Sequence, residues 1–169
     1  TGAGSGIGAG IAFAMAAAGA RVVCADIDMA AATRTAEKIG AESLALGADV
    51  GAVDEIETML DATLSRFGRI DIMVNNAGVT RRADILDLTE ADWDLVQDVN
   101  LKGLFFLSQR VARRMKADGG GRIINVASIN GVVGYYRRAA YCSSKAGVVN
   151  LPRVLALEWA NLGINVNAI

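Results

Sequence analysis

A tyrosine and a lysine four residues apart are the first candidates for chemistry in this sequence. On a helix, Tyr141 and Lys145 would share one face, with their Cβ atoms roughly 5–6 Å apart. A free tyrosine titrates near pH ~10, too high for a good base at neutral pH, and a neighbouring cation favours the phenolate. Tyr141 could therefore serve as an acid or base tuned by Lys145. By itself, however, this spacing is common and usually has no function.

The absence of histidine narrows the possible chemistry. Without it, the Ser-His-Asp and Cys-His schemes of nucleophilic catalysis are excluded. The two cysteines, Cys24 and Cys142, lie far apart and give neither a disulfide framework nor a zinc-ligand spacing. We therefore expect no metal site, and the cysteine usage fits the reducing cytoplasm.

Glycines at the start of the chain form a second candidate site. The run from Thr1 to Gly8 leads into an alanine-rich helical stretch, where glycine lets the backbone approach a pyrophosphate. An ordinary turn explains the glycines alone equally well. Asp26, eighteen residues after Gly8, closes the next expected strand and could accept hydrogen bonds from a ribose diol. This favours NAD(H) over NADP(H), unless Asp26 only caps the strand end.

Short strand-like runs alternate with helical patterns and must position these residues. Several runs are apolar on both faces, as a parallel sheet covered on each side requires. Helical spacing recurs between Ile56 and Phe67 and from Thr89 to Met115, with Thr89 and Asp92 as a capping pair. The pattern predicts an α/β, Rossmann-like, doubly wound parallel sheet with helices on both faces. The expected strands are Arg21–Ala25, Ser43–Ala48, Ile70–Asn75, Arg122–Ala127 and Ile164–Ala168.

The position of Ser128 strengthens the case that Tyr141 and Lys145 belong to a functional site. It follows the strand Arg122–Ala127, and Tyr141 lies thirteen residues later. The carboxyl ends of parallel strands are where ligands bind in open α/β sheets. The whole ordered set resembles the short-chain dehydrogenase/reductase family, over essentially the entire chain. The motifs that carry the resemblance are the glycine-rich opening, Asp26, Asp49-Val50, Asn75-Asn76-Ala77-Gly78, Asn100, Ser128 and Tyr141-x-x-x-Lys145.

The resemblance implies a role for each residue of a catalytic set. Tyr141 would exchange a proton with the substrate oxygen while hydride passes between the substrate carbon and nicotinamide, and Ser128 would hold the same oxygen. Lys145 would also bind the nicotinamide ribose, and Asn100 would anchor a water linking Lys145 to solvent. For Asn75, cofactor contact and a structural hydrogen bond between strands remain open. The expected NAD-binding residues are Gly2, Ser5, Gly6, Ile7, Gly8, Asp26, Ile27, Asp49, Val50, Asn76, Ala77, Gly78, Tyr141 and Lys145.

Arginines near the expected substrate entrance bear on the substrate. Arg81-Arg82 and Arg137-Arg138 could bind a carboxylate, although exposed arginine is more often simple solvated surface. The chain is similar to family members that oxidise gluconate-type sugar acids, which implies a sugar acid or polyol substrate. A 3-oxoacyl thioester reductase is the nearest alternative, and Asp26 counts against it because those relatives mostly use NADPH. A catalytically silent NAD-binding scaffold is the alternative of another class.

Composition bounds the size and the partners of the protein. With 169 residues and 53% hydrophobic residues, the chain is expected to form a single domain over residues 1–169. Seventeen basic and eighteen acidic residues, mixed along the chain, give no footprint for nucleic acid or an anionic membrane. The longest low-polarity stretch, Ala9 to Ala20, is too short to span a bilayer. We expect a soluble, cytoplasmic protein.

The resemblance also raises expectations about assembly and about the chain ends. It implies a homo-oligomer, a dimer or a homotetramer, in which the helix after Tyr141 packs against its counterpart; Pro152 should kink that helix. Relatives have a first strand before the glycine turn, and a substrate-covering region and a last strand after Ile169, so the chain looks truncated at both ends. Because the missing strand would be central, we expect two half-sheets with unpaired edges and poor folding in isolation.

Overall fold

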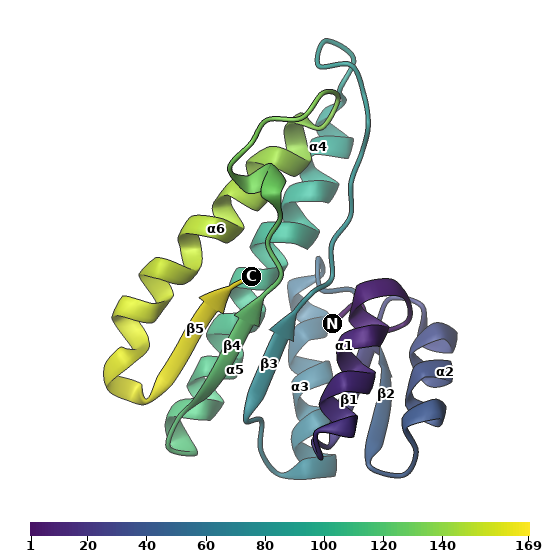
Figure 1. The fold of residues 1–169 in the computed structure, drawn as a ribbon, viewed down its shortest axis with the longest axis vertical. Helices are drawn as coiled ribbons and strands as arrows, with labels where there is room; N and C mark the ends of the chain where they lie inside the picture. Colours follow the sequence, from purple (N-terminus) through teal and green to yellow (C-terminus); the bar gives the residue numbers. More distant parts are fainter.

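Helices and strands alternate along the chain in the computed structural model, which describes residues 1–169 (Figure 1). The element η1 is a π-helix, and η2 and η3 are short 3-10 helices. The elements in order are α1 (Gly6–Ala17), β1 (Val22–Asp26), α2 (Met29–Ile39), β2 (Ser43–Gly47), α3 (Val53–Phe67), β3 (Ile72–Asn75), α4 (Glu90–Gln97), η1 (Asp98–Gly103), α5 (Leu104–Ala117), β4 (Gly121–Asn125), η2 (Ile129–Gly131), α6 (Ala139–Trp159), η3 (Ala160–Leu162) and β5 (Ile164–Ala168).

The five strands form two parallel sheets. The pair β1-β2 makes one sheet and β3-β4-β5 the other, and every strand pairing is parallel. Helix α1 lies in front of the strands in Figure 1, and α3 and α5 lie behind them. The expected α/β architecture with helices on both faces is confirmed, and so are the two half-sheets. Each observed strand agrees with its expected range to within two residues at either end.

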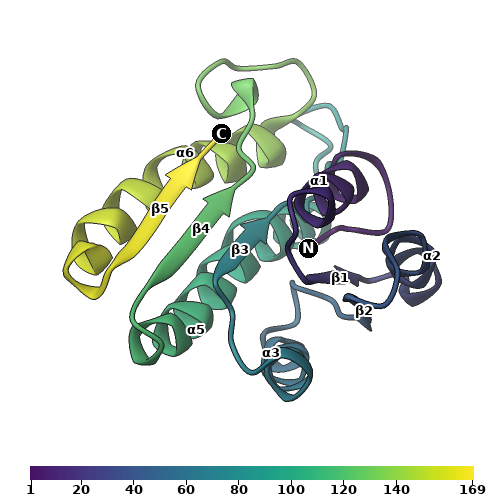
Figure 2. The same ribbon diagram turned by 60° about the horizontal axis from the view of Figure 1, so that its bottom comes forward.

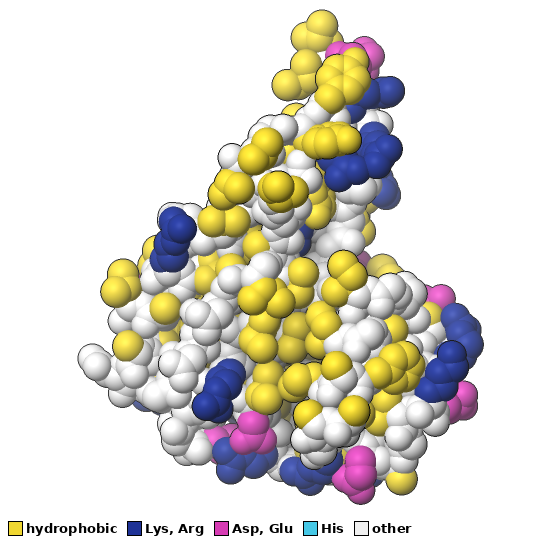
Figure 3. All heavy atoms as spheres, in the orientation of Figure 1, with side chains coloured by type: hydrophobic (Ala, Val, Ile, Leu, Met, Phe, Trp, Pro, Cys, Tyr) yellow, Lys and Arg dark blue, Asp and Glu magenta, His cyan; other side chains and the backbone are white.

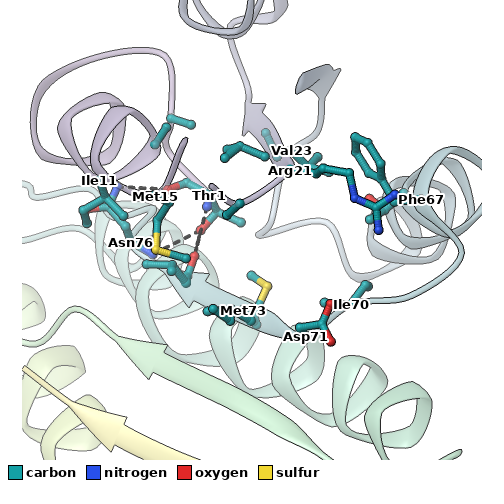
Figure 4. A pocket seen from close by; sticks show the side chains of 18 of the residues that line it. Thr1, Ile11, Met15, Arg21, Val23, Phe67, Ile70, Asp71, Met73 and Asn76 are labelled. Carbon is teal, nitrogen blue, oxygen red and sulfur yellow. Dashed lines mark hydrogen bonds between the residues drawn. The ribbon is translucent and has the colours of Figure 1, made fainter. Parts of the chain in front are cut away.

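A groove of about 350 Å³ separates β1 from β3. Figure 4 shows Thr1, Met15 and Asn76 at one end of this groove and Arg21 beside Phe67 at the other. The first residues of the chain join the two sheets at their carboxyl ends, as Figure 2 also shows. Thr1 N donates to Val74 O at 3.0 Å, and Ala3 N donates to Ala25 O at 3.1 Å. The glycine-rich loop is thereby held between the sheets.

Two separate apolar clusters support the sheets. The larger contains fifteen buried residues and fixes α3, α5 and α6 on the three-stranded sheet; Leu107, Met115 and Ile123 in it are almost fully buried. The smaller joins α1 and α2 to β1 through Ala3, Ala12, Cys24 and Ala36. Its small side chains let α1 approach the strands closely, which places the first turn of α1 at the carboxyl end of β1.

The segment from Thr89 to Met115 differs from the expectation of one helical pattern. The α-helical bonding is interrupted by the π-helix η1 between α4 and α5. The capping pair is confirmed, because Asp92 N donates to Thr89 Oγ1 at 3.1 Å. The sequence pattern did not reveal this segment, because a π-helix is a single wide turn inserted within a longer run of helix.

Helix α6 runs from Ala139 through the buried Pro152 to Trp159. The proline therefore does not end the helix, and the kink expected there stays a prediction. None of the helices combines the length and the apolar character that a membrane crossing requires.

Candidate active site

Two loops and the helices that follow them meet beyond the carboxyl ends of β3 and β4 (Figure 1). The first loop leads from β3 to α4, and the second leads from β4 through η2 to α6. The candidate catalytic residues come from η1, from the end of β4 and from the first turns of α6. The sequence predicts ligand binding at this same edge of the sheet.

Lys145 is a buried lysine without a carboxylate partner. The residue is 4% exposed, and its Nζ donates to Val126 O, just beyond β4, at 2.7 Å. Burial lowers the pKa of Lys145 below its ordinary value of 10.5, because desolvation penalises the ammonium form. The Nζ lies 5.9 Å from the centroid of the Tyr141 ring. The structure therefore places the predicted pair side by side.

The side chain of Asn100, in the π-helix η1, is buried and fully engaged. Its Oδ1 accepts from Val79 N at 2.7 Å, and its Nδ2 donates to Val79 O at 2.9 Å and to Ser144 Oγ at 3.0 Å. Ser144 in turn donates to Tyr141 O at 2.8 Å. Asn100 thus joins the β3–α4 loop to the helix that carries Tyr141. That it also anchors a water for Lys145 stays a prediction.

Ser144 is a residue that sequence reasoning missed. It is fully buried between the two members of the Tyr-Lys pair and bonds to both Asn100 and the Tyr141 backbone. The sequence did contain one indication of this role. A serine three residues after Tyr141 on a helix can donate a hydrogen bond to the tyrosine's backbone carbonyl. Its partner in η1 is set only by the fold.

Ser128 begins the loop that leads to α6. Its Oγ accepts from Asn130 N at 3.1 Å and so caps η2. The hydroxyl proton has only a long contact, 3.5 Å, to Asn130 Oδ1. The half-buried hydroxyl is therefore held in place while its proton remains able to turn toward a substrate oxygen.

The glycine-rich loop has the shape that a phosphate-binding turn needs. Gly6, with φ of 53°, begins α1 in a conformation that favours glycine. A Cβ on Gly8 would overlap Gly2 O, so only glycine permits this close approach. Ser5 is the N-cap but makes no side-chain cap bond. The first amides of α1, including that of Ile7, have no partner within the helix and could bind a pyrophosphate.

Asp26 ends β1 beside the glycine loop. Its Oδ2 accepts from Gly4 N at 2.8 Å and its Oδ1 accepts from Asp28 N at 3.0 Å. These bonds fix the carboxylate, and each oxygen keeps a lone pair for a ribose hydroxyl. Ile7 and Ile27 are 71% and 74% exposed. These two exposed apolar side chains flank the expected dinucleotide site, where the flat rings of a bound dinucleotide could pack against them.

Asp49 and Val50 follow β2. Asp49 Oδ1 accepts from Gly51 N at 2.8 Å, while Asp49 N donates to Glu55 at 2.8 Å. Val50 is 8% exposed and belongs to the larger apolar cluster. The loop is therefore ordered by its own bonds, and adenine contact by these two residues stays a prediction.

The end of β3 connects the glycine loop to the catalytic residues. Asn75 Nδ2 donates to Ser108 Oγ and to Asn125 Oδ1, both at 2.8 Å, which supports the structural alternative for Asn75. Asn76 Nδ2 donates to Thr1 O at 2.9 Å and to Gly2 O at 3.3 Å, and so ties the glycine loop to β3.

Ala77 and Gly78 continue from this point toward the catalytic pair. Ala77 N donates to Thr1 Oγ1 at 3.1 Å. A Cβ on Gly78 would lie 3.3 Å from Asn100 Oδ1 and 3.8 Å from Lys145 Nζ. The expected cofactor-binding stretch therefore passes directly from the glycine loop to the buried lysine.

Comparisons with known proteins agree with this arrangement. The short chain dehydrogenase family model matches residues 1–169. The chain is 45% identical to 2-dehydro-3-deoxy-D-gluconate 5-dehydrogenase of Escherichia coli (strain K12), over 85% of this chain and 58% of that protein. It is 43% identical to D-threitol dehydrogenase of Mycolicibacterium smegmatis, over 100% of this chain and 66% of that protein. The chain thus spans less than two thirds of the length of either relative.

A solved structure has the same fold. The 3-ketoacyl-(acyl-carrier-protein) reductase from Brucella melitensis, complexed with NADH, superposes with a TM-score of 0.96 at 35% identity. The match covers 99% of this chain and 70% of that one. With a family model that matches its whole length, this chain belongs to the short-chain dehydrogenase family.

Proposed function

We propose that the protein is an NAD(H)-dependent oxidoreductase that interconverts a secondary alcohol and a ketone. The observation that carries the proposal is the buried, carboxylate-free Lys145 beside Tyr141, at the carboxyl ends of β3 and β4. Desolvation of an ammonium group is unfavourable, so a buried lysine without an ion pair points to a functional role. Membership of a dehydrogenase family supports the same activity.

Each residue of the site has a distinct task in this mechanism. The nicotinamide ring, when bound, supplies the carbon that takes or gives the hydride. Tyr141 holds the proton that leaves or joins the substrate oxygen, and Ser128 donates a hydrogen bond to that oxygen. Lys145 places its ammonium beside the Tyr141 ring, where it stabilises negative charge that develops on the tyrosine oxygen as the proton moves, and it donates to the ribose. Asn100 and Ser144 hold the first turn of α6 in register with η1.

Asp26 makes NAD(H) the preferred cofactor in this proposal. In Asp26→Asn we expect KM for NAD⁺ to rise by about 10- to 100-fold, since charge-assisted hydrogen bonds to the ribose are lost. The 2′-phosphate of NADP⁺ would also no longer meet a negative charge. Steady-state kinetics with both cofactors measure the ratio of their kcat/KM values.

Asp28→Asn is the matched control for that experiment. It removes a negative charge two residues away, and asparagine still caps α2 as Asp28 does. Its cofactor preference should equal that of the unmodified protein. An unchanged preference in Asp26→Asn would show that Asp26 only orders the strand end.

For the substrate we propose a sugar acid or a polyol. Support comes from relatives whose names describe a deoxygluconate dehydrogenase and a threitol dehydrogenase. The test is an assay of NAD⁺ reduction by the full-length protein against a panel of sugar acids and polyols. Turnover of at least one compound is expected. Dinucleotide binding without turnover of any compound would favour the catalytically silent scaffold.

Reduction of a 3-oxoacyl thioester is the second candidate, favoured by the likeness to the Brucella reductase. That structure is complexed with NADH, so an NAD(H) preference at Asp26 does not separate the two substrate classes. The panel therefore includes an acetoacetyl thioester with NADH. Preferential turnover of the thioester would replace the sugar-acid proposal and leave the oxidoreductase mechanism in place.

We also propose that the protein acts in the cytoplasm as a homo-oligomer, a dimer or a tetramer. Val154 and Leu157 on α6 are 45% and 82% exposed. Apolar side chains in consecutive turns of one helix would be covered if α6 packed against a second copy.

A further inference from the structure

Four arginines, Arg81, Arg82, Arg137 and Arg138, are candidates for binding a substrate carboxylate, and they differ in burial and in ion pairing. Arg81 forms an ion pair with Asp92, with Nε 3.2 Å from Oδ1, and both side chains are well exposed. Arg82 and Arg137 are exposed at the surface. Arg138 alone among the four is partly buried. Figure 3 shows Lys and Arg side chains gathered beside apolar ones near the narrow end of the molecule, which the two site loops form.

Arg138 lies against the ring of the predicted acid/base. Its guanidinium carbon is 4.9 Å from the centroid of the Tyr135 ring and 5.9 Å from that of Tyr141. It precedes α6 as the N-cap residue, three positions before Tyr141. Its backbone is joined to the first turn of α6, because Cys142 N donates to Arg138 O at 2.8 Å.

The guanidinium has donors to spare. Its Nε is buried without a hydrogen-bond partner, and no acidic side chain forms an ion pair with it. A buried donor left unpaired is costly, and its presence in a native fold calls for an explanation. Planar, forked donors match a carboxylate, which can accept from two of them at once.

We propose that Arg138 binds the carboxylate of an anionic substrate, so that this residue selects acids over uncharged alcohols. This inference rests on the proposed function. Because the guanidinium lies beside the Tyr141 ring, only a few carbon atoms separate the carboxylate from the carbon that loses or gains hydride. The site thus takes short hydroxy or keto acids, such as sugar acids.

The test measures binding separately from turnover. The probes are D-gluconate and D-glucitol, which share a carbon chain and differ by the carboxylate. Calorimetry on the full-length protein loaded with NADH gives Kd for each probe without any reaction. In Arg138→Met we expect Kd for gluconate to rise by about 10- to 100-fold, because a charge-assisted pair is lost. Kd for glucitol should change less than about twofold.

Two further variants guard the interpretation. Arg138→Lys keeps the positive charge but loses the paired N–H donors of the guanidinium. It should therefore bind gluconate more tightly than Arg138→Met and more weakly than the unmodified protein. Arg137→Met removes the exposed neighbouring charge and should leave both affinities unchanged. Equal losses for gluconate and glucitol, or no gluconate binding to the unmodified protein, would overturn the inference. Failure of the proposed function has another signature, which is the absence of turnover of every alcohol and ketone while gluconate affinity still depends on Arg138.

Discussion

Replacing Tyr141 with phenylalanine should lower kcat by roughly 10²- to 10⁴-fold, the range expected when a positioned general acid or base is removed. The change deletes one hydroxyl group. The Tyr141 backbone carbonyl still accepts from Ser144, and the ring still packs beside Lys145 and Arg138. Affinity for NADH, measured by fluorescence titration, should therefore stay within a few-fold.

Tyr136→Phe is the control for this experiment, since Tyr136 is 78% exposed in the loop before α6. It should retain full activity. A Tyr141→Phe protein that turns over substrate at the unmodified rate would refute the assigned mechanism. Loss of NADH binding together with activity would show that Tyr141 acts mainly as one of the expected NAD-binding residues and not as the acid/base.

Replacing Lys145 with methionine should lower kcat by about 100-fold or more and should at the same time change the pH dependence of stability. We expect the loss of activity because the Lys145 ammonium is then absent and only the Arg138 guanidinium remains beside the Tyr141 ring to stabilise negative charge that develops on its oxygen. The matched control is Lys116→Met, since Lys116 is exposed on α5. It should change neither property.

The stability effect follows from the lowered pKa of Lys145. Between that lowered value and the ordinary value of 10.5, the unfolded chain binds a proton at this lysine and the folded chain does not. The free energy of unfolding therefore rises with pH across that window, by at most about 1.4 kcal/mol per pH unit. Below the window both states bind the proton, and the folded state bears the cost of the buried ammonium.

Lys145→Met should remove this rise and stabilise the protein at neutral pH, because methionine fills the space without a charge to desolvate. Urea unfolding at several pH values between 7 and 10 measures both effects. The outcome that contradicts the interpretation is a free energy of unfolding in Lys145→Met that follows the same pH dependence as in Lys116→Met.

Much of the fold and the family was readable from the sequence, since these features depend on local spacing. Apolar runs located the strands to within two residues, and the Thr89–Asp92 cap has the expected bond. The ordered motifs from Gly2 to Lys145 indicated the family that the comparisons show. These features can be predicted from local sequence, because strand alternation, helical periodicity and capping each involve residues only a few positions apart.

The tertiary structure decided what depends on contacts between distant segments. The bond from Asn100 to Ser144 joins residues 44 positions apart, and the bond from Lys145 to Val126 spans 19. Among four similar arginines, only packing against Tyr135 and Tyr141 distinguished Arg138. Hydrogen bonds and burial at such sites arise when separate elements dock, so no pattern within one segment specifies them. Tyr141 and Lys145 could be named from the sequence, but the buried surroundings that make Lys145 unusual exist only in the folded chain.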